Sequence, residues 1–571
     1  MHPAPSSSET SQNADTAPLT RPIAIVLLIA FTLIWFAGLD TRKLMHPDEG
    51  RYAEIAREMA QSSDWVTPRL NGIKYFEKPA LQYWIGAASF DAFGVREGTA
   101  RLWPALAGWL TVLFIGYTGL RIGGARVGLY AAAALGGCLW WVFNAHLLTL
   151  DAGLSWWMGA GLGSFLIAQV AATSAREQRA WMIAAWIALA LAVLSKGLIG
   201  IVLPAAALTI YSLVERDLAL WKRVHLAAGA VVFLAITAPW FVVVSLRNPE
   251  FFDFFFIHEH FTRFLTSEAK RVAPWWYFAP MLAVGILPWL SVFAWETRRA
   301  WAGASASANG FRWQRFALIW AAFIFVFFSL SGSKLPSYIL PMFPALASII
   351  AWQLSTIDDT LLFRLSLPLV ALTGGMWLLL LFGYDAIAPR LAGPEQPLAP
   401  FLNYAPWLRW GAGIAFAGGV AGMWALRRGR RTSAVLVIAF ATLVAAQLLL
   451  TGYDAFAETR SSQPLLARII AAHGPFRAYL PFYSVRMYDQ TLPYYLGRTI
   501  IQVDHPDELE MGLASEPDKA IAQVSTWRAI WDRVPDAYAI MPPDDYAKLR
   551  RDGVPMRELG RDTRRVIVSR R

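Results

Sequence analysis

The sequence predicts a polytopic α-helical membrane protein that carries a small soluble α/β domain at its C-terminal end. Hydrophobic residues make up 56% of the 571 residues, and charged residues only 16%. Soluble domains are closer to about 45–50% apolar and about a quarter charged. The apolar residues also gather in long runs up to about residue 453, after which the composition becomes that of a soluble domain.

Thirteen apolar runs are long enough to be spans, since a helix needs about 20 mostly apolar residues to cross a bilayer. The first run continues to Leu39 without the small-residue cleavage pattern of a signal peptide, so we interpret it as a span. The 27 Trp and 18 Tyr suit many membrane–water interfaces, where these rings concentrate. The expected spans are 22–39, 100–120, 126–145, 151–172, 180–195, 198–214, 225–246, 275–295, 313–331, 337–354, 363–384, 406–426 and 433–453.

The distribution of Lys and Arg orients these spans. Basic residues gather in the connections after even-numbered spans, and the most basic connection is 427–431. Basic connections stay in the cytoplasm, so we expect the segments 40–99 and 247–274 and the C-terminal domain outside. The net charge of +11 then reflects topology and contact with anionic membrane lipid, and nucleic acid is not an expected partner.

The first 453 residues are expected to form a cytoplasmic tail and a transmembrane domain with interfacial segments. Residues 1–20 are rich in Ser, Thr, Ala and Pro and should form a disordered cytoplasmic tail, followed by a transmembrane domain over 21–453. Within 40–99, the helical spacing of apolar residues from Glu49 predicts an interfacial helix, and a second helix is expected over 80–93. The Phe-rich run 251–256 is interpreted as a lipid-facing anchor.

Residues 454–571 are expected to form the soluble α/β domain, which is close to the common domain size. They contain no glycine-rich nucleotide loop or zinc-knuckle spacing, and the single cysteine, Cys138, excludes an intrachain disulfide. The expected strands are 476–480, 499–503, 537–541 and 565–568, and the expected helices are 464–472 and 525–532.

Acidic and basic residues cluster on the predicted outer face, where the topology rule favours few cations. The densest group is HPDEGR at 46–51, directly after the first span. The carboxylates of Asp48 and Asp151 have two interpretations: each caps the helix that follows, or each serves a reaction, because charge at membrane depth is costly. Lys196, in a turn between two spans, either snorkels to the surface or belongs to the same site.

Together these residues predict an outer-face pocket suited to a reaction on a phosphorylated lipid. Cations would hold the phosphate and stabilise the charge that gathers on it as a leaving group, while carboxylates orient the reacting groups. The pocket residues are the acids Asp48, Glu77 and Asp151 and the cations Arg51, Lys78, Lys196, Arg263 and Lys334.

Glu77, His258 and His260 also permit a metal site, because carboxylate and imidazole are normal zinc ligands. The i, i+2 spacing of the two histidines does not place them on one helix face. Interfacial histidines with local hydrogen bonds are therefore the alternative. A zinc ion that joins Glu77 to His258 is the metal site that the sequence predicts.

At these residues the chain resembles a known family. The segment DTRKLMHPDEGRY at 40–52 looks like the first outer loop of the GT-C membrane glycosyltransferases related to protein O-mannosyltransferases. With YFEKPALQYW at 75–84 and Arg96-Glu97, it is most similar to the bacterial 4-amino-4-deoxy-L-arabinose (aminoarabinose) lipid A transferases. Secondary similarities lie at 194–197 and 333–341, and the layout of spans and outer domain agrees.

The resemblance implies an inverting transfer of aminoarabinose from undecaprenyl phosphate to lipid A phosphates at the periplasmic face of the inner membrane. A cationic sugar on these phosphates weakens their attraction for polymyxin and other cationic peptides. By position, Asp48 and Asp151 would be the catalytic acids, and Lys78, Arg51 and Arg263 would hold the carrier phosphate. The substrate-binding residues that it implies are Arg51, Tyr75, Lys78, Tyr83, Lys196, Arg263, Lys334 and Tyr338.

Two alternatives remain open from the sequence. A related transferase could move another sugar to a protein or glycan hydroxyl, and its first-loop acid would then have to accept a proton. A lipid transporter is the other alternative. Transporters commonly carry repeated halves and charges near the bilayer midplane, whereas the unusual charges here lie on one face and no repeat is evident.

Overall fold

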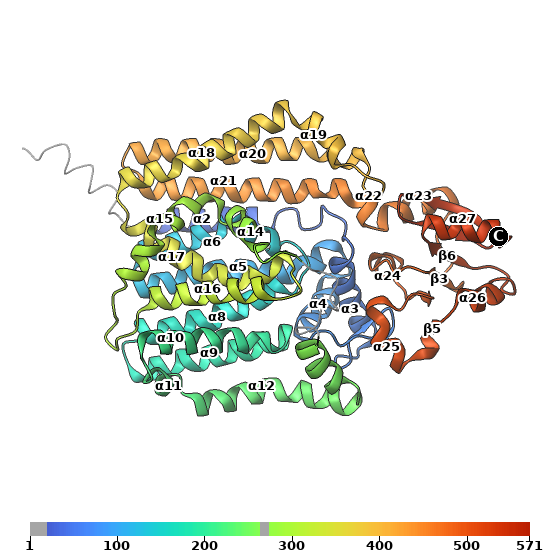
Figure 1. Cartoon of the computed structure of the whole chain (residues 1–571), viewed down its shortest axis with the longest axis horizontal. Helices are drawn as coiled ribbons and strands as arrows, with labels where there is room; N and C mark the ends of the chain where they lie inside the picture. The colour runs from blue at the N-terminus through green and yellow to red at the C-terminus, as the bar shows by residue number, and fades with distance from the viewer. Residues whose placement is uncertain (1–19, 263–272) are drawn as a thin grey trace, which may run out of the picture.

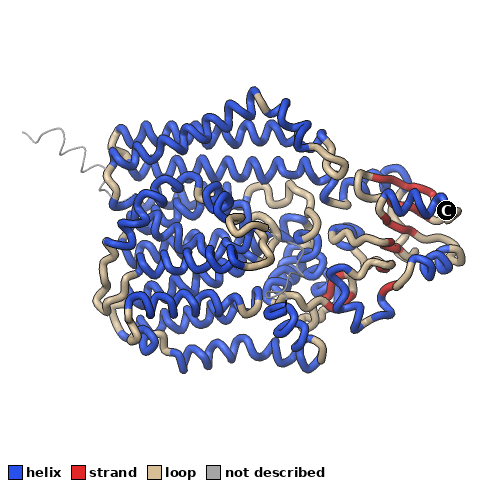
Figure 2. The backbone as a smooth tube through the Cα atoms, in the orientation of Figure 1, coloured by secondary structure: helices blue, strands red, loops and turns tan. Residues whose placement is uncertain are grey.

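The computed structural model describes residues 20–262 and 273–571. Long helices lie side by side in a bundle, and the C-terminal part of the chain forms a separate unit with a β-sheet beyond one end of the bundle (Figures 1 and 2). We call this the sheet end of the bundle. The segment between helices α2 and α5 lies there, between the bundle and the sheet (Figure 1).

The bundle helices follow the predicted apolar runs closely. They are α2 (Arg21–Phe36), α5 (Glu97–Gly123), α6 (Ala125–Gly136), α7 (Leu139–Ala145), α8 (Asp151–Val170), α9 (Ala175–Lys196), α10 (Ile199–Glu215), α12 (Leu226–Arg247), α14 (Phe278–Gly285), α15 (Leu290–Ala302), α16 (Trp313–Leu330), α17 (Phe343–Thr356), α18 (Asp359–Phe382), α20 (Leu398–Arg427) and α21 (Arg431–Gly452). Two short helices, α11 (Leu220–Arg223) and α19 (Tyr384–Leu391), connect them.

Two runs predicted as single spans are bent. Helices α6 and α7 meet at 65°, and α14 meets the helical stretch Leu287–Ala302 at 78°. Gly136 and Gly137 stand at the first break, where glycine weakens the helix. Pro288 stands at the second, where it cannot donate the backbone hydrogen bond that a continuous helix requires.

The structure is that of a multi-pass membrane protein. Within the described residues, seven helices are long and apolar enough to cross a bilayer, or up to nine if each bent pair is one span, and α2 and α10 are shorter apolar helices. The expected number of thirteen spans is therefore not confirmed. In α12 and α18 only 22% of the most apolar window is buried, so most of their apolar side chains face outward, as contact with lipid requires.

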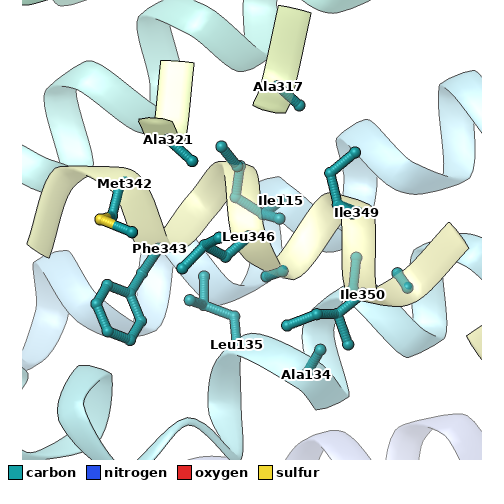
Figure 3. Packing of buried hydrophobic residues seen from close by; sticks show 14 of the residues in the cluster. Ile115, Ala134, Leu135, Ala317, Ala321, Met342, Phe343, Leu346, Ile349 and Ile350 are labelled. Atoms are coloured by element: carbon teal, nitrogen blue, oxygen red, sulfur yellow. The ribbon is translucent and has the colours of Figure 1, made fainter. Parts of the chain in front are cut away.

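Helix α17 runs through the core of the bundle, and 83% of the apolar window that contains it is buried. Leu346 and Ile350 lie beside Leu135 of α6 and Ile115 of α5, while Ala317 of α16 faces them (Figure 3). Small residues at such contacts let helices approach closely, which stabilises packing in a membrane where lipid removes the hydrophobic drive between helices.

The segment between α2 and α5 contains two helices, as predicted. They are α3 (Asp48–Ser62) and α4 (Leu81–Phe93), separated by the antiparallel hairpin of β1 (Arg69–Leu70) and β2 (Ile73–Lys74). The π-helix η1 (Asp253–Thr262) packs beside this segment. Phe251 and Phe255 are buried with Phe76, so the interpretation of this Phe run as a lipid anchor is wrong for these two rings.

The C-terminal unit holds a six-stranded sheet in the order β5-β4-β3-β6-β8-β7. Strands β5, β4, β3 and β6 are parallel to one another, and β8 pairs antiparallel with β6 and β7. The strands are β3 (Phe482–Val485), β4 (Ile501–Val503), β5 (Ala520–Ile521), β6 (Tyr538–Met541), β7 (Arg557–Arg561) and β8 (Val566–Ser569), and the helices are α22 (Ala457–Arg460), α23 (Gln463–His473), α24 (Thr491–Leu496), α25 (Glu510–Ser515), α26 (Val524–Trp531) and α27 (Pro543–Arg551).

One expected strand is wrong. Residues 476–480 form a turn, and the strand begins two residues later as β3. Both stretches alternate in a β-like manner, but only β3 finds two parallel neighbours, β4 and β6, with which to exchange backbone hydrogen bonds. Strands β5 and β7 were not predicted, because their short or polar sequences give no local signal.

Candidate active site

The first turn of α3 carries a cation held between two carboxylates. Asp48 is the first residue of this helix and does not cap it; its Oδ1 instead accepts a hydrogen bond from Arg51 Nη1 at 3.0 Å. Arg51 Nη2 lies 2.5 Å from Glu508 Oε2 of the C-terminal unit. The side chain of Asp48 is 32% exposed, whereas those of Arg51 and Glu508 are 9% exposed. Arg51 therefore joins two acids from distant parts of the chain.

The neighbouring carboxylate of Glu49 has a structural role. It accepts hydrogen bonds from Arg101 Nε and Nη2 at 2.7 and 2.9 Å, and from the backbone N–H groups of Met45 and Leu148 at 3.1 and 3.2 Å. Burial of Glu49 acts to raise its pKa, but the Arg101 guanidinium outweighs burial and lowers the pKa to about 2. This charged anchor fixes the start of α3 against α5, and so positions Asp48 and Arg51.

Three tyrosines surround Arg51. The Arg51 guanidinium lies 5.8 Å from the ring centroid of Tyr52, which is 6.2 Å from the ring of Tyr83. Tyr75 and Tyr83 are 2% and 1% exposed, and among the described residues their hydroxyls have no hydrogen-bond partner. Burial, together with the carboxylate of Glu77, raises the pKa of both phenols, so they stay neutral donors. Buried hydroxyls of this kind require a water or a ligand.

Lys78 connects the segment before α4 to the π-helix η1. Its Nζ donates to the backbone carbonyl of Glu77 at 2.6 Å and to Glu259 Oε2 at 3.0 Å, and it lies 4.0 Å from Glu77 Oε2. The Lys78 side chain is 20% exposed and that of Glu259 is 6% exposed. The ammonium thus faces a largely buried, acidic environment.

A second charged group lies where α8 begins and α9 ends. Asp151 is the first residue of α8 and makes no cap; its Oδ1 accepts a hydrogen bond from Lys196 Nζ, and its Oδ2 accepts one from Ser337 Oγ at 2.9 Å. Lys196 Nζ also lies 5.0 Å from the ring centroid of Tyr338. Since the Lys196 side chain is only 12% exposed, it does not snorkel. Both residues instead form one site with Tyr338.

Helix α4 connects the two charged groups through its neighbouring residues Gln82 and Tyr83. Its amide Nε2 donates to the carbonyls of Leu150 at 2.8 Å and Ser195 at 3.4 Å, which are the residues directly before the acid and the lysine of the second group. The residue after it, Tyr83, faces the first group. A cavity of about 20 Å³ lies here, with Gln82, Tyr83, Leu150 and Tyr52 in its lining. That volume holds about one water, so a sugar needs further opening of the site.

One expected cation, Lys334, stands apart from these groups. Lys334 is 7% exposed, and its Nζ donates to the carbonyl of Ser331 at 2.5 Å, which places the charge inside the turn before Ser337 rather than on a carboxylate. Arg263 lies outside the described residues, so its predicted role stays a prediction.

The zinc site predicted at Glu77 and His258 receives no support from the geometry. His258 Nδ1 lies 4.0 Å from Glu259 Oε1, and the Lys78 ammonium occupies the space between Glu77 and Glu259. In the described part of the chain, no three His, Cys, Asp or Glu side chains gather in a way that could hold a metal ion. The zinc site therefore stays a prediction, and no step of the chemistry below uses a metal ion.

Several residues of the site were missed from the sequence. Gln82 and Ser337 lie inside two of the stretches that carry the family resemblance, so the resemblance could have identified them as site residues. Glu508 is different. It lies in the short helix η5 (Asp507–Leu509), more than 450 residues after Arg51, in a domain with no recognised motif. No local signal marks it.

Comparisons with known proteins agree with this architecture. The family model "Aminoarabinose transferase C-terminal domain" matches residues 466–570, and the model "Dolichyl-phosphate-mannose-protein mannosyltransferase" matches residues 23–255. The undecaprenyl phosphate-alpha-4-amino-4-deoxy-L-arabinose arabinosyl transferase of Erwinia tasmaniensis is 32% identical over 57% of this chain, which spans 58% of the length of that relative. The relative of the same name from Pectobacterium carotovorum is 32% identical over 69% of this chain and 70% of its own length.

The solved structures match at nearly full length. ArnT from Cupriavidus metallidurans bound to undecaprenyl phosphate has a TM-score of 0.90 and 36% identity, over 97% of this chain and 98% of that chain. Its apo state has a TM-score of 0.88 over 96% and 98% of the two chains. The predicted GT-C fold is therefore confirmed. With the C-terminal domain, the fold and the curated relatives in agreement, this chain belongs to the aminoarabinose transferase family of membrane glycosyltransferases.

Proposed function

We propose that this chain transfers 4-amino-4-deoxy-L-arabinose from undecaprenyl phosphate to phosphate groups of lipid A. The observation that carries the proposal is the pair of charged groups at the sheet end of the bundle. Arg51 lies between Asp48 and Glu508, and Lys196 lies against Asp151. Helix α4 reaches both groups, because Gln82 binds the backbone beside Asp151 and Lys196 while Tyr83 lies beside Tyr52. Cations and carboxylates so arranged suit a substrate that is both a phosphate ester and an amine.

The charges of the reaction balance without proton transfer. An oxygen of the lipid A phosphate attacks the anomeric carbon, a new C–O bond forms, and the bond from that carbon to the carrier phosphate breaks. The carrier phosphate leaves with the electron pair, and the configuration at the carbon inverts. One phosphate monoester becomes a diester while one diester becomes a monoester, so Asp48 need not act as a general base. Positioning and charge stabilisation are then the tasks of the protein.

The charge of each side chain determines which part of the substrate it would bind. Arg51 faces the buried phenols of Tyr75 and Tyr83, and Lys78 is a largely buried cation in the same segment. These two residues would hold the carrier phosphate and stabilise its charge as it leaves, with Arg263 as a third candidate. The carboxylates of Asp48, Asp151 and Glu508 would attract the amino group of the sugar. Tyr75, Tyr83 and Tyr338 offer neutral hydroxyls and ring faces to the sugar.

The proposed function places the active site on the periplasmic side of the membrane. The basic connection at 427–431 lies at the end of the bundle opposite the sheet, and basic connections stay in the cytoplasm. The site and the C-terminal unit would therefore face the periplasm of a bacterial inner membrane. The modified lipid A would weaken the attraction of the outer membrane for polymyxin. A Ser515→Cys variant tests this, because Ser515 is exposed and the native Cys138 is buried. A membrane-impermeant maleimide should label Ser515→Cys in intact spheroplasts, and absence of label before lysis would overturn the orientation.

The activity is tested with membranes that contain the protein and a donor labelled in its sugar. Label should move to lipid A, and Asp48→Asn should abolish the transfer while the protein stays folded. Glu250→Gln is the matched control, because Glu250 is also a partly exposed acid paired with a cation: its side chain is 27% exposed and lies 2.7 Å from Lys74. Glu250→Gln should keep full transfer.

Each other outcome has a defined meaning. Label on protein or glycan would favour the related hydroxyl transferase, for which the family model over residues 23–255 is the supporting observation. Movement of intact donor lipid across the membrane without cleavage would favour a transporter. Normal turnover in Asp48→Asn would remove this carboxylate from the mechanism.

A further inference from the structure

A buried turn of the C-terminal unit, Asp489–Thr491, lies directly against the first turn of α3. Gly50 makes this approach possible. A Cβ atom at position 50 would lie 2.7 Å from the carbonyl carbon and oxygen of Gln490 and from the Thr491 nitrogen, which is shorter than real Cβ contacts allow. Only glycine lets the two backbones meet here. We call residues 489–491 the docking turn.

The docking turn is held rigidly from its own side. The carboxylate of Asp489 lies 2.7 Å from Arg565 Nη1, and both side chains are 0% exposed. The other oxygen of Asp489 accepts hydrogen bonds from the hydroxyl and the N–H of Thr491, at 2.6 and 3.0 Å. The Thr491 hydroxyl also lies 2.9 Å from that of Ser462. The turn thus has fixed partners on the C-terminal unit and a close backbone contact on α3.

From this fixed turn a chain of contacts leads to the site. Gln490 is 7% exposed, and its Nε2 donates to Glu508 Oε1 at 2.8 Å. The other oxygen of Glu508 lies 2.5 Å from Arg51 Nη2, and Arg51 Nη1 donates to Asp48. Each contact uses a different atom of its residue, so the Gln490 amide orients the carboxylate that in turn orients the guanidinium.

We propose that Gln490 is a positioning residue of the transfer site, and that the C-terminal unit completes this site by holding Glu508 against Arg51 through the docking turn. This inference rests on the proposed function. It gives the C-terminal unit a specific task, because without the amide of Gln490 the carboxylate of Glu508 has rotational freedom and Arg51 loses a fixed partner.

Gln490 also influences the charge of Glu508. Burial raises the pKa of Glu508, while Arg51 and the Gln490 amide act in the opposite direction by favouring the carboxylate. A change at Gln490 should therefore alter the pH at which Glu508 takes up a proton. The groups that face Glu508 are Arg51, Glu77, Asp507, Tyr75, Tyr83 and Tyr488.

The test replaces Gln490 with methionine, which keeps the length of the side chain and removes the amide donor. The control is Gln502→Met. Gln502 is a buried glutamine of strand β4 in the same C-terminal unit, and within the described structure neither atom of its side-chain amide has a hydrogen-bond partner. Both full-length variants are purified in detergent, and transfer from a labelled donor to lipid A is followed across pH, with separate values of kcat and KM.

Gln490→Met should lower kcat/KM about tenfold at pH 7, the effect of losing a hydrogen bond to a charged group. Because Glu508 loses a donor that favours its charged form, the fall of activity at acidic pH should begin at a higher pH. Gln502→Met should leave both the rate and the pH profile unchanged. A merely structural role of Gln490 would lower activity equally at every pH.

The wild type and Asp48→Asn, measured in parallel, distinguish a failure of the Gln490 role from a failure of the proposed function. If Asp48→Asn is inactive while Gln490→Met matches Gln502→Met in rate and pH profile, the positioning role of Gln490 is overturned and the proposed function stands. If the wild-type protein moves no label to lipid A, the proposed function itself fails. A Gln490→Met protein with reduced activity and an unshifted pH profile also overturns the inference.

Discussion

Neutralising each of the two adjacent carboxylates at the start of α3, Asp48 and Glu49, should have a different effect on the protein. Glu49→Gln removes the charge of a side chain that is 5% exposed and paired with an Arg101 side chain that is 0% exposed. Asp48→Asn removes the charge of a side chain that is 32% exposed. We expect the first change to reduce stability and the second to abolish transfer, although both lie on the same turn.

The magnitude follows from the contacts of Glu49. Removal of one partner of a buried ion pair costs about 3–5 kcal/mol, because the other charge stays buried without compensation. The pKa of Glu49 falls from 4.5 to about 2 on folding, and at about 1.4 kcal/mol per unit this corresponds to about 3 kcal/mol. For the more exposed pair of Asp48 with Arg51, the expected cost is about 0–1 kcal/mol.

The contribution of Glu49 to the free energy of unfolding should decrease as the pH falls. Since the pKa of Glu49 is lower in the folded protein, its contribution is fully present above about pH 4.5 and is lost as the pH falls toward about 2. Denaturant titrations of the detergent-solubilised protein at neutral and acidic pH measure this directly. The stability difference between wild type and Glu49→Gln should be largest at neutral pH and shrink in acid. A Glu49→Gln protein that is as stable as wild type at pH 7 would refute the reasoning.

Three further predictions concern the remaining charges. Asp151→Asn should destabilise the protein by about 3–5 kcal/mol by leaving Lys196 unpaired, and Lys196→Met in that background should restore part of the loss; a double variant that is less stable than Asp151→Asn contradicts this. Lys78→Ala should weaken binding of undecaprenyl phosphate about tenfold in a direct titration with little change in melting temperature, and an unchanged Kd removes Lys78 from the phosphate site. Arg565→Met should leave Asp489 buried without its main cation and destabilise the C-terminal unit by about 3–5 kcal/mol, seen as faster limited proteolysis after residue 460; equal proteolysis rates would contradict this.

The helices of the bundle were predictable because lipid imposes a simple rule on the chain. A backbone in hydrocarbon must satisfy its own hydrogen bonds, so each long apolar run becomes a helix. The same rule does not reveal bends. The breaks at Gly137 and Pro288 interrupt runs whose hydropathy is continuous, and their angles depend on neighbouring helices. In the soluble unit, strand β3 was displaced from 476–480 because pairing with β4 and β6, rather than local alternation, selects the strand.

In the site, the chemical types of the side chains were readable from the sequence, but their partners were not. The motif at 46–51 marks Asp48 and Arg51, and the acid and lysine at positions 151 and 196 stand out because charge next to apolar helices is costly. Which carboxylate caps, which anchors and which faces the substrate is decided by distance in three dimensions. Glu49 turned out to be the anchor through Arg101, a residue that gives no sign of this in its own segment.

The amino-acid sequence alone was sufficient for the class of protein, its helical bundle, its α/β C-terminal unit and the residue types of its charged loops, because these depend on local composition and spacing. The folded chain alone brings Glu508 to Arg51, Ser337 to Asp151 and Gln490 to the first turn of α3. Each of these contacts joins segments that lie at least 186 residues apart in the sequence. Their energies depend on burial and on ångström-scale distances, and neither quantity exists until the bundle and the sheet have packed together.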